Sequence, residues 1–394
     1  MRSKEPQLGY GGTLDRLSLD QDPRMAGMLR KTFDHILRKV LKSRFPGINV
    51  QIARETSLLE GATSAVTVQV EGALQVMFKL DVDTVPKEIR GYKIMEQVFP
   101  HHTLKLLYCD DNAGLLCIPF LATARNLHDV VKDGLLGERD VLILYEDFCR
   151  QMLALWNQTY SSRRPDYEDQ FVKRLRLRTK QAERLFSNSV AGQELSFSEL
   201  LRIPLWVNGI RYPPLAELLE LAVRLILENP APCSVTAHRD EHAKNILVEM
   251  ATSGDVPLWY LIDLPNVSTR ADWVWSIAKM RHWWQVYYYI DQAKRISSPP
   301  TGAQEADINF EVTPHGALIE YDINHRIPPI CRTLDQKVES FAKQMGNLLR
   351  DSKWFKRYRA SLFLVLYGGI PYHRHCQHVI PTLLGEAVKA LLAE

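Results

Sequence analysis

The sequence lacks the features that mark membrane-spanning, secreted and disulfide-rich proteins. No stretch of the 394 residues approaches the roughly 20 apolar residues of a membrane-spanning helix, and the first residues lack the apolar run of a signal peptide. The six cysteines include no C-x-x-C pair, which argues against a disulfide framework and against a cysteine zinc site. We therefore expect a cytoplasmic protein with reduced thiols.

An excess of charge of one sign is also lacking. The formal net charge is +3, so the overall balance indicates neither a nucleic acid nor a membrane as a partner. One local basic run, KRLRLRTK from Lys173 to Lys180, is typical of a solvated helix face. With 46% hydrophobic residues, the chain can form an ordinary globular core and is long enough for two domains.

Two kinds of pattern divide the chain. The runs INVQIA, AVTVQV and LQVMFKL, separated by Glu-Gly turns, predict an antiparallel meander, followed by a helix over 87–98 and the strand candidates TLKLLYC and GLLCIPFL. Helical patterns then dominate, interrupted by the strand-like pieces CSVTA, NILVE and LWYLIDL. Residues 271–295 are predicted to form a buried central helix, and residues 297–330 an irregular excursion.

These patterns predict an α+β protein with two lobes. The first lobe is small, antiparallel and β-rich, and the second is larger and mainly helical. The expected domains are an N-terminal arm and helix over 1–45, the small lobe over 46–121 and the large lobe over 122–394.

The segment CSVTAHRDEHAKNILVE, residues 233–249, carries two overlapping motifs. His238, Glu241 and His242 form H-x-x-E-H, the pattern of an inverted zinc-peptidase helix. That interpretation requires a helix, because i, i+4 spacing places two imidazoles on one face. The flanking runs are β-like and leave little room for a helix. A zinc hydrolase is therefore kept as a third interpretation.

The second motif is H-x-D-x-x-x-x-N, which requires a strand–loop–strand context. A phosphotransferase loop places a carboxylate at the acceptor hydroxyl and an amide at the metal, and Asp240 and Asn245 have that spacing. A second metal ligand is expected at the end of the next strand, where Asp263 stands. The pattern therefore favours phosphoryl transfer.

Phosphate binding further upstream requires a lysine on a strand and an acid on the following helix. Lys79 in VMFKL and Glu88 in VPKEIRGYKIM meet this requirement, and Glu96 is a weaker rival for the acid.

From about Leu58 to His282, these residues resemble the aminoglycoside phosphotransferase and choline kinase-like families, small-molecule members of the protein-kinase-like fold. The families read H-G-D-x-H-x-x-N in the catalytic loop, and this chain reads HRDEHAKN, with Arg239 in place of the glycine. The resemblance implies an enzyme that transfers the γ-phosphoryl group of ATP, with Mg²⁺, to a hydroxyl of a small polar acceptor. An amino sugar or aminoglycoside-like antibiotic is the first expected acceptor, followed by choline-like and nucleoside-like molecules.

The resemblance also implies roles for the matched residues. Asp240 would orient the acceptor hydroxyl and take its proton, and His242 would help to neutralise the transferred phosphoryl group. Asn245 and Asp263 would hold Mg²⁺. The nucleotide would be held by Lys79 with its partner Glu88, by the loop residues Gly61, Ala62, Thr63 and Ser64, and by a hinge that includes Ile118 and Phe120.

The helix start D-P-x-x-D-L-A of these families is only half matched. Asp272 occupies the first acid, but Ser276 stands at the second, which normally anchors the backbone of the catalytic loop. With a single glycine in the nucleotide loop as well, a non-catalytic kinase-like module that binds a nucleotide or a protein is the second interpretation.

Three further expectations concern the surroundings of the motif. His238 is predicted to be structural and to bond to backbone. The aromatic run within 271–295 is interpreted as core, with a cation–π box for a choline-like acceptor as the alternative. The acidic candidates for binding a cationic acceptor are Glu241, Asp291, Glu320 and Asp322.

Overall fold

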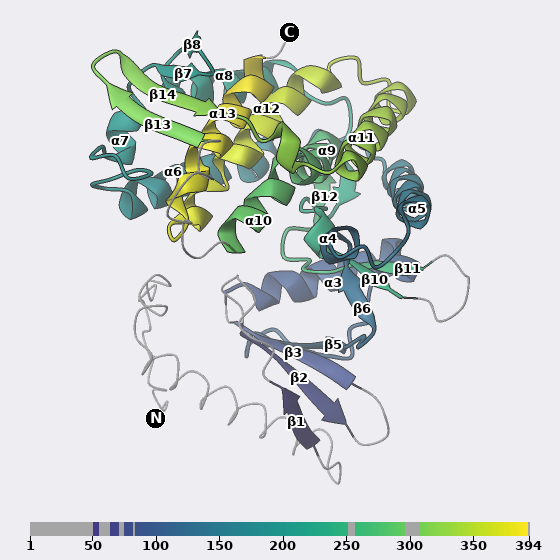
Figure 1. Ribbon diagram of the computed structural model, residues 1–394. Helices are drawn as coiled ribbons and strands as arrows, with labels where there is room; N and C mark the ends of the chain where they lie inside the picture. Colours follow the sequence, from purple (N-terminus) through teal and green to yellow (C-terminus); the bar gives the residue numbers. More distant parts are fainter. Residues whose placement is uncertain are drawn as a thin grey trace, which may run out of the picture. The chain divides into compact units, whose positions relative to one another are not determined.

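The computed structural model describes residues 50–54, 64–70, 75–81, 83–250, 257–295 and 308–392 (Figure 1). The arm and helix expected over 1–45 lie outside these ranges. The chain divides into two compact units, the first comprising 1–89 with 105–122 and the second 90–104 with 123–394. Residues 90–104 thus group with the second unit, whereas the sequence places them with the first.

The first unit is built on one antiparallel sheet. Its strands are β1 (Val50–Arg54), β2 (Ser64–Val70), β3 (Gln75–Leu80), β4 (Tyr108–Asp110) and β5 (Leu115–Pro119). They lie in the order β1-β2-β3-β5-β4, and each neighbouring pair is antiparallel, which confirms the predicted meander. Helix α3 (Val85–Val98) follows β3, and Val85, Ile89, Tyr92 and Met95 form its buried face at helical spacing.

The second unit is mainly helical, as the sequence predicts. Its α-helices are α4 (Leu127–Lys132), α5 (Glu138–Gln158), α6 (Arg174–Leu185), α7 (Phe197–Leu200), α8 (Leu215–Glu228), α9 (Trp273–His282), α10 (Tyr288–Arg295), α11 (Pro329–Leu348), α12 (Trp354–Tyr367) and α13 (Ile380–Leu392). Two π-helical segments, η2 (Glu168–Lys173) and η4 (Trp283–Tyr287), adjoin α6 and α9. Short 3₁₀ segments are η1 (Pro100–His102), η3 (Ala243–Asn245), η5 (Asn324–Arg326), η6 (Ile370–His373) and η7 (Gln377–Val379).

Short strands in the second unit position the catalytic motif. Strands β6 (Ala124–Asn126), β10 (Ile246–Glu249) and β11 (Leu258–Leu261) form an antiparallel sheet in the order β11-β10-β6. Strand β9 (Val235–Ala237) pairs with β12 (Ser268–Ala271). The motif therefore lies between β9 and β10, the strand–loop–strand context that phosphoryl transfer requires.

One sheet of the second unit was not predicted from the sequence. Strands β7 (Leu205–Val207), β8 (Ile210–Tyr212), β13 (Ile308–Thr313) and β14 (Gly316–Tyr321) form it in the order β13-β14-β7-β8. The prediction of an irregular excursion over 297–330 is wrong from residue 308 onward, because β13 and β14 form a hairpin there. Buried and exposed residues do not alternate strictly along β14, which weakens its strand signal.

The aromatic run of α9 and η4 belongs to the core. Four of its tryptophans donate their ring N–H to partners within the protein: Trp273 to Asp351, Trp275 to the Arg239 carbonyl, Trp283 to His128 and Trp284 to Tyr145. All four rings are buried. Because the indole N–H groups are satisfied internally, the core interpretation is confirmed over a cation–π box.

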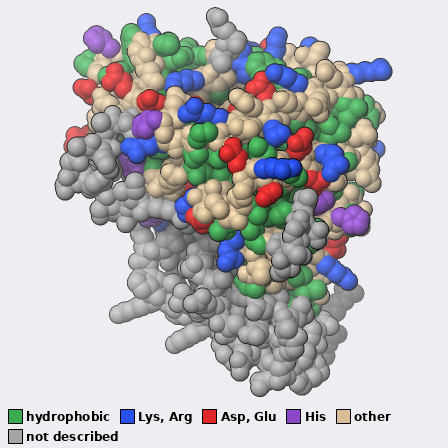
Figure 2. All heavy atoms as spheres, turned by 45° about the vertical axis from the view of Figure 1, so that its right-hand side comes forward, with side chains coloured by type: hydrophobic (Ala, Val, Ile, Leu, Met, Phe, Trp, Pro, Cys, Tyr) green, Lys and Arg blue, Asp and Glu red, His purple; other side chains and the backbone are tan. Residues whose placement is uncertain are grey.

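The described surface shows a mixture of charges. On the face drawn in Figure 2, basic and acidic side chains are interspersed among apolar and other side chains. None of the helices within the described ranges is long and apolar enough to cross a membrane.

Candidate active site

The catalytic loop is held by His238, which lies between β9 and the loop. Its Nδ1 accepts a hydrogen bond from the Asp240 backbone N–H (3.1 Å), and its Nε2 lies 2.8 Å from the Ile262 carbonyl oxygen. Since Nδ1 is the acceptor, Nε2 carries the proton and donates it to that carbonyl. His238 therefore fixes the loop to the segment that leads into Asp263, and it is structural, as predicted.

This geometry removes the zinc interpretation. Residues 238–242 form no helix, and both ring nitrogens of His238 are bonded to backbone groups. Glu241 is buried and bonded to a serine hydroxyl. Within the described ranges, no three His, Cys, Asp or Glu residues are grouped as metal ligands. The H-x-x-E-H pattern in the sequence therefore does not correspond to a zinc-binding site.

Asn245 and the Asp263 segment are joined through the backbone. The Asn245 Nδ2 donates to the Asp240 carbonyl (2.9 Å), and the Ile262 N–H donates to the Asn245 carbonyl (3.0 Å). No hydrogen bond among the described residues uses the Asn245 Oδ1. Asp263 follows directly, with φ +61°, a strained conformation of the kind that gathers at functional sites. An amide oxygen and a carboxylate fit Mg²⁺, which prefers oxygen ligands.

Arg239 stands where the families that the motif resembles have glycine, and its backbone explains that preference. Its φ is +66°, the left-handed region that glycine adopts without steric cost. The conformation is held by its neighbours: the Arg239 carbonyl accepts from the Trp275 ring (3.0 Å), and its Nε donates to the Asn266 carbonyl (2.6 Å). An arginine is accommodated here because its side chain and its backbone are both bonded.

The loop anchor expected from an acid at position 276 is supplied from the opposite side. Ser276 donates its hydroxyl to Glu241 Oε1 (2.7 Å), and the same oxygen lies 3.2 Å from the Arg239 backbone nitrogen, which donates to it. Glu241 is only 1% exposed. Here the carboxylate belongs to Glu241 on the loop and the hydroxyl to Ser276 on the helix. The loop backbone is therefore still anchored to α9, although position 276 carries no acid.

Asp240 faces a lysine that the sequence analysis missed. The Lys279 Nζ, from α9, lies 2.7 Å from Asp240 Oδ1, and the two side chains are 12% and 15% exposed. Burial alone would raise the pKa of Asp240, but Lys279, His242 and Arg174 together hold it far below its usual range. Asp240 is therefore a carboxylate at neutral pH, ready to accept a hydrogen bond from a hydroxyl group.

His242 lies beside this pair as a neutral ring. It stacks on Trp283 with ring centroids 4.7 Å apart, and its Nε2 lies 3.9 Å from Asp240 Oδ1. Burial lowers the pKa of His242 to about 4, although the Asp240 charge acts in the opposite direction. A neutral imidazole can donate a hydrogen bond to a phosphoryl oxygen, but it cannot supply the positive charge that the resemblance implies.

Lys79 and Glu88 meet in the first unit. The Lys79 Nζ lies 2.7 Å from Glu88 Oε1, and the residues are 8% and 0% exposed. Lys79 stands on β3 and Glu88 in the first turn of α3, so the strand–helix pair expected for phosphate binding is formed with Glu88. A buried ion pair of this kind fixes the lysine in one position.

The other nucleotide-binding candidates are only partly described. Gly61, Ala62 and Thr63 lie outside the described residues, and Ser64 begins β2. Ile118 is buried in β5 opposite Met77 of β3, and Phe120 follows the strand in a half-buried position.

Gly91 marks a close approach of helix α3 to the backbone after Asp263. A Cβ atom at position 91 would lie 2.0 Å from the Leu264 carbonyl oxygen. Real Cβ atoms do not come so near to a backbone oxygen, so only glycine fits between the helix and this segment.

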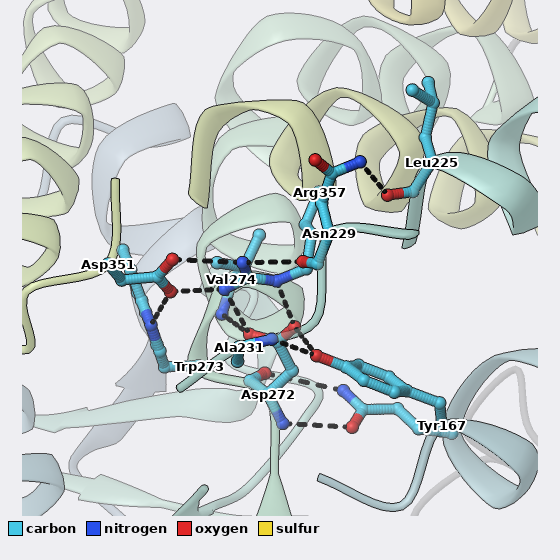
Figure 3. Close-up of polar contacts among 10 residues, drawn as sticks. Tyr167, Leu225, Asn229, Ala231, Asp272, Trp273, Val274, Asp351 and Arg357 are labelled. Carbon is cyan, nitrogen blue, oxygen red and sulfur yellow. Dashed lines mark hydrogen bonds and ion pairs between the residues drawn. The ribbon is translucent and has the colours of Figure 1, made fainter. Parts of the chain in front are cut away.

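The start of α9 is fixed by a buried charge network (Figure 3). Asp272 caps the helix through the Val274 N–H (3.1 Å) and accepts from Arg357 Nε (2.7 Å) and the Tyr167 hydroxyl (3.2 Å). Arg357 also bonds both oxygens of Asp351 and is 0% exposed. Burial would lower the pKa of Arg357, but Asp272 and Asp351 raise it well above its usual value. The helix that carries Lys279 is thereby tied to α12.

The interpretation of KRLRLRTK as a solvated face is only partly correct, because two of its arginines are half-buried and interact electrostatically with Asp240. Arg174 and Arg178 are half-buried, one helical turn apart, whereas Lys180 and Arg184 are exposed. Only part of the basic run is therefore solvated. In the sequence, the i, i+4 spacing indicates that the two arginines share one face of a helix. The spacing does not show whether that face is solvated or packed against the rest of the protein.

Comparisons with known proteins bring no match by sequence and several by structure. No protein-family model matches the chain, and no curated protein matches it significantly. An ethanolamine kinase from Plasmodium vivax is similar in structure, with 10% identity and a TM-score of 0.49, over 92% of this chain and 88% of the other. A choline kinase from Streptococcus pneumoniae has 12% identity and a TM-score of 0.41, over 85% and 99%.

A third solved structure, described as a putative aminoglycoside phosphotransferase from Ralstonia eutropha, has 10% identity and a TM-score of 0.43, over 91% of this chain and 98% of the other. These are proteins of the families that the sequence motifs resemble. Their identities to this chain are 10% to 12%, and their TM-scores lie below 0.5.

Proposed function

We propose that the protein is an ATP-dependent phosphotransferase whose acceptor is a hydroxyl group of a small molecule. The observation that carries the proposal is the arrangement of the catalytic loop, in which Asp240 is paired with Lys279 and Asn245 is bonded to the Asp263 segment. Phosphoryl transfer needs chiefly positioning and charge neutralisation, which this arrangement supplies.

Asp240 is the residue proposed to act on the acceptor. Its carboxylate accepts the hydrogen bond of the attacking hydroxyl, orients that oxygen, and receives the proton as the new phosphate ester forms. Because the pKa of Asp240 is held so low, it orients the hydroxyl in the ground state and takes the proton only when the oxygen has become acidic. His242, which lies beside Asp240, would donate a hydrogen bond to an oxygen of the transferred phosphoryl group.

ATP and Mg²⁺ are the cofactors of the proposal. Asn245 and Asp263 would hold Mg²⁺, which would neutralise charge on the phosphate groups. Lys79, fixed by Glu88, would contact the α- and β-phosphates. The remaining nucleotide contacts are assigned to the backbone of Gly61, Ala62, Thr63 and Ser64 and to the hinge with Ile118 and Phe120.

The proposed acceptor is a small hydroxylated molecule, and its charge is the open choice. Amino-sugar, choline-like and nucleoside-like acceptors follow from the family resemblance. Two of the four acids expected to bind a cation are already engaged: Glu241 with Ser276, and Asp291 with Lys244 and His128. Glu241 and Asp291 are therefore already neutralised or bonded within the protein, whereas Glu320 and Asp322 are exposed.

The non-catalytic alternative loses one of its two supports. Its first support was Ser276, and Glu241 now supplies the anchor that Ser276 lacks. Its second support was the single glycine of the nucleotide loop, which lies outside the described residues.

Nucleotide binding and turnover together test the proposal. We expect Mg²⁺ and ATP to raise the melting temperature of the protein, and Asp263→Ala to abolish that increase. Asp240→Asn should keep the increase but lower phosphoryl transfer by roughly 100-fold or more. Glu220→Ala, which removes an exposed carboxylate on α8, serves as the control. An increase that persists in Asp263→Ala, or transfer that survives Asp240→Asn, contradicts the assigned roles.

A further inference from the structure

Helix α6 carries two cations in the electrostatic surroundings of Asp240. Arg174 and Arg178 stand four residues apart on one face of the helix and are half-buried. Arg174 is among the charges that act on Asp240 and on Lys279, and Asp240 in turn acts on Arg178. The geometry agrees: Arg174 lies over the Trp275 ring, and that ring donates its N–H to the carbonyl of Arg239, the residue before Asp240 (3.0 Å). The ammonium of Lys279 and the guanidinium groups of Arg174 and Arg178 thus belong to the surroundings of Asp240.

Neither guanidinium has a carboxylate partner within the described ranges. Arg174 lies over the Trp275 ring, 5.4 Å from its centroid, and no described residue accepts a hydrogen bond from it. Arg178 donates to the Gln181 side chain (2.7 Å) and to the Tyr372 hydroxyl, both of which are neutral. Two half-buried like charges one turn apart repel each other, so this arrangement is costly without an anion.

The nearby carboxylates are already paired elsewhere. Asp240 pairs with Lys279, and Asp169 lies 3.5 Å from Arg239. Glu241 is buried under the loop with Ser276. None of these acids contacts Arg174 or Arg178, so the two guanidinium groups keep their positive charge without a paired carboxylate among the described residues.

We propose that Arg174 and Arg178 bind an anionic group of the acceptor, a phosphate or a carboxylate, while its hydroxyl group lies at Asp240. This inference rests on the proposed phosphotransferase function and names its substrate class. A guanidinium group matches a phosphate or carboxylate with two parallel hydrogen bonds, and its charge stays fixed at any physiological pH. A cationic amino sugar or a choline-like molecule would instead meet three positive charges.

The experiment presents the intact protein with acceptors sorted by charge. A metabolite extract is separated by ion exchange into anionic, neutral and cationic fractions, and each is incubated with the protein, Mg²⁺ and ATP labelled at the γ-phosphate. We expect labelled product from the anionic fraction. Phosphatase treatment of that fraction before the assay separates the two sources, since it removes an acceptor that binds through a phosphate monoester and spares one that binds through a carboxylate.

Matched variants of α6 test the assignment of the two arginines. Arg174→Gln with Arg178→Gln should raise the KM for the anionic acceptor roughly 10- to 100-fold and leave the KM for ATP unchanged. Lys180→Gln with Arg184→Gln removes the same charge from the exposed part of the helix, and both kinetic constants should stay within about twofold of wild type.

The possible results distinguish failure of the inference about the acceptor's charge from failure of the phosphotransferase proposal. Transfer confined to the neutral or cationic fraction overturns the inference and leaves the phosphotransferase proposal standing. An unchanged acceptor KM in the Arg174 and Arg178 variant also overturns it. Absence of transfer in all three fractions overturns both, and the Asp263-dependent ATP shift then shows whether nucleotide binding survives.

Discussion

The Lys279 ammonium lies 2.7 Å from the carboxylate of Asp240, within one compact unit of the chain. The two residues come from a buried helix and from the loop between two short strands, 39 positions earlier in the sequence. The pair keeps the residue proposed to act on the acceptor ionised, and it places a positive charge directly beside that carboxylate.

Removal of that charge should change the pH dependence of phosphoryl transfer. In Lys279→Met, the pKa of Asp240 rises because its nearest cation is lost, so the acidic limb of the kcat/KM profile moves to higher pH. We also expect a loss of roughly 100-fold in kcat/KM at neutral pH. Lys279→Arg, which keeps a cation, should retain the wild-type limb. An unchanged limb in Lys279→Met would show that this lysine does not set the ionisation of Asp240.

His242 should make the protein less stable in acid. Its pKa is about 4 when folded and about 6.5 when unfolded, so the unfolded chain binds the extra proton between these values. Stability is therefore lost as pH falls from 6.5 toward 4, by about 2 kcal/mol at pH 5. His242→Phe keeps a ring to stack on Trp283 but binds no proton. Urea unfolding at pH 6.5 and pH 5 should show a smaller loss in this variant, and equal losses would refute the assignment.

Arg357 should be essential for stability rather than for binding. Arg357→Met leaves the carboxylates of Asp272 and Asp351 buried without their cation, which costs about 3–5 kcal/mol. Arg359→Met, on the same helix, removes a half-buried arginine that bonds only the Leu391 carbonyl and should cost about 1 kcal/mol. Chemical denaturation measures both, and similar costs for the two variants would argue against the network.

The left-handed backbone of Arg239 predicts an unusual order of two substitutions. Arg239→Gly and Arg239→Ala lose the same side-chain hydrogen bonds, but only glycine avoids the steric cost of φ +66°. We expect Arg239→Gly to be about 0.5–1 kcal/mol more stable than Arg239→Ala in urea unfolding. On the exposed part of α6, Lys180→Gly should instead be about 1 kcal/mol less stable than Lys180→Ala. The same order at both positions would mean that Arg239 is unstrained.

The strand–loop–strand arrangement around Asp240 and Asn245 could be predicted because its signal is local in sequence. Asp240 and Asn245 are five residues apart, and the β-like runs on either side indicate the strands that hold them. Lys79 and Glu88 were predicted in the same way, from a strand followed by a helix. Each pair depends on contacts between neighbouring elements, which short patterns report well.

The rest depends on contacts between distant segments. Lys279 lies in a helix that is apolar on nearly every side, so its sequence gives no sign of a charged partner. Arg174 and Arg178 sit in a basic run whose composition is the same whether it faces water or a site. Arg357 belongs to a region without any motif, and Glu241 replaces an acid that was expected on another element. The spacing of residues in the sequence does not show which distant side chains come into contact in the fold.

The tie between Asp272 and Arg357 has a consequence for the order of events during synthesis. The carboxylate leaves the ribosome 85 residues before the guanidinium that neutralises it. Until α12 emerges, the beginning of α9 has no cation for its aspartate, and burying that charge alone would be unfavourable. The helix that carries Lys279 can therefore settle into its final place only after α12 has emerged.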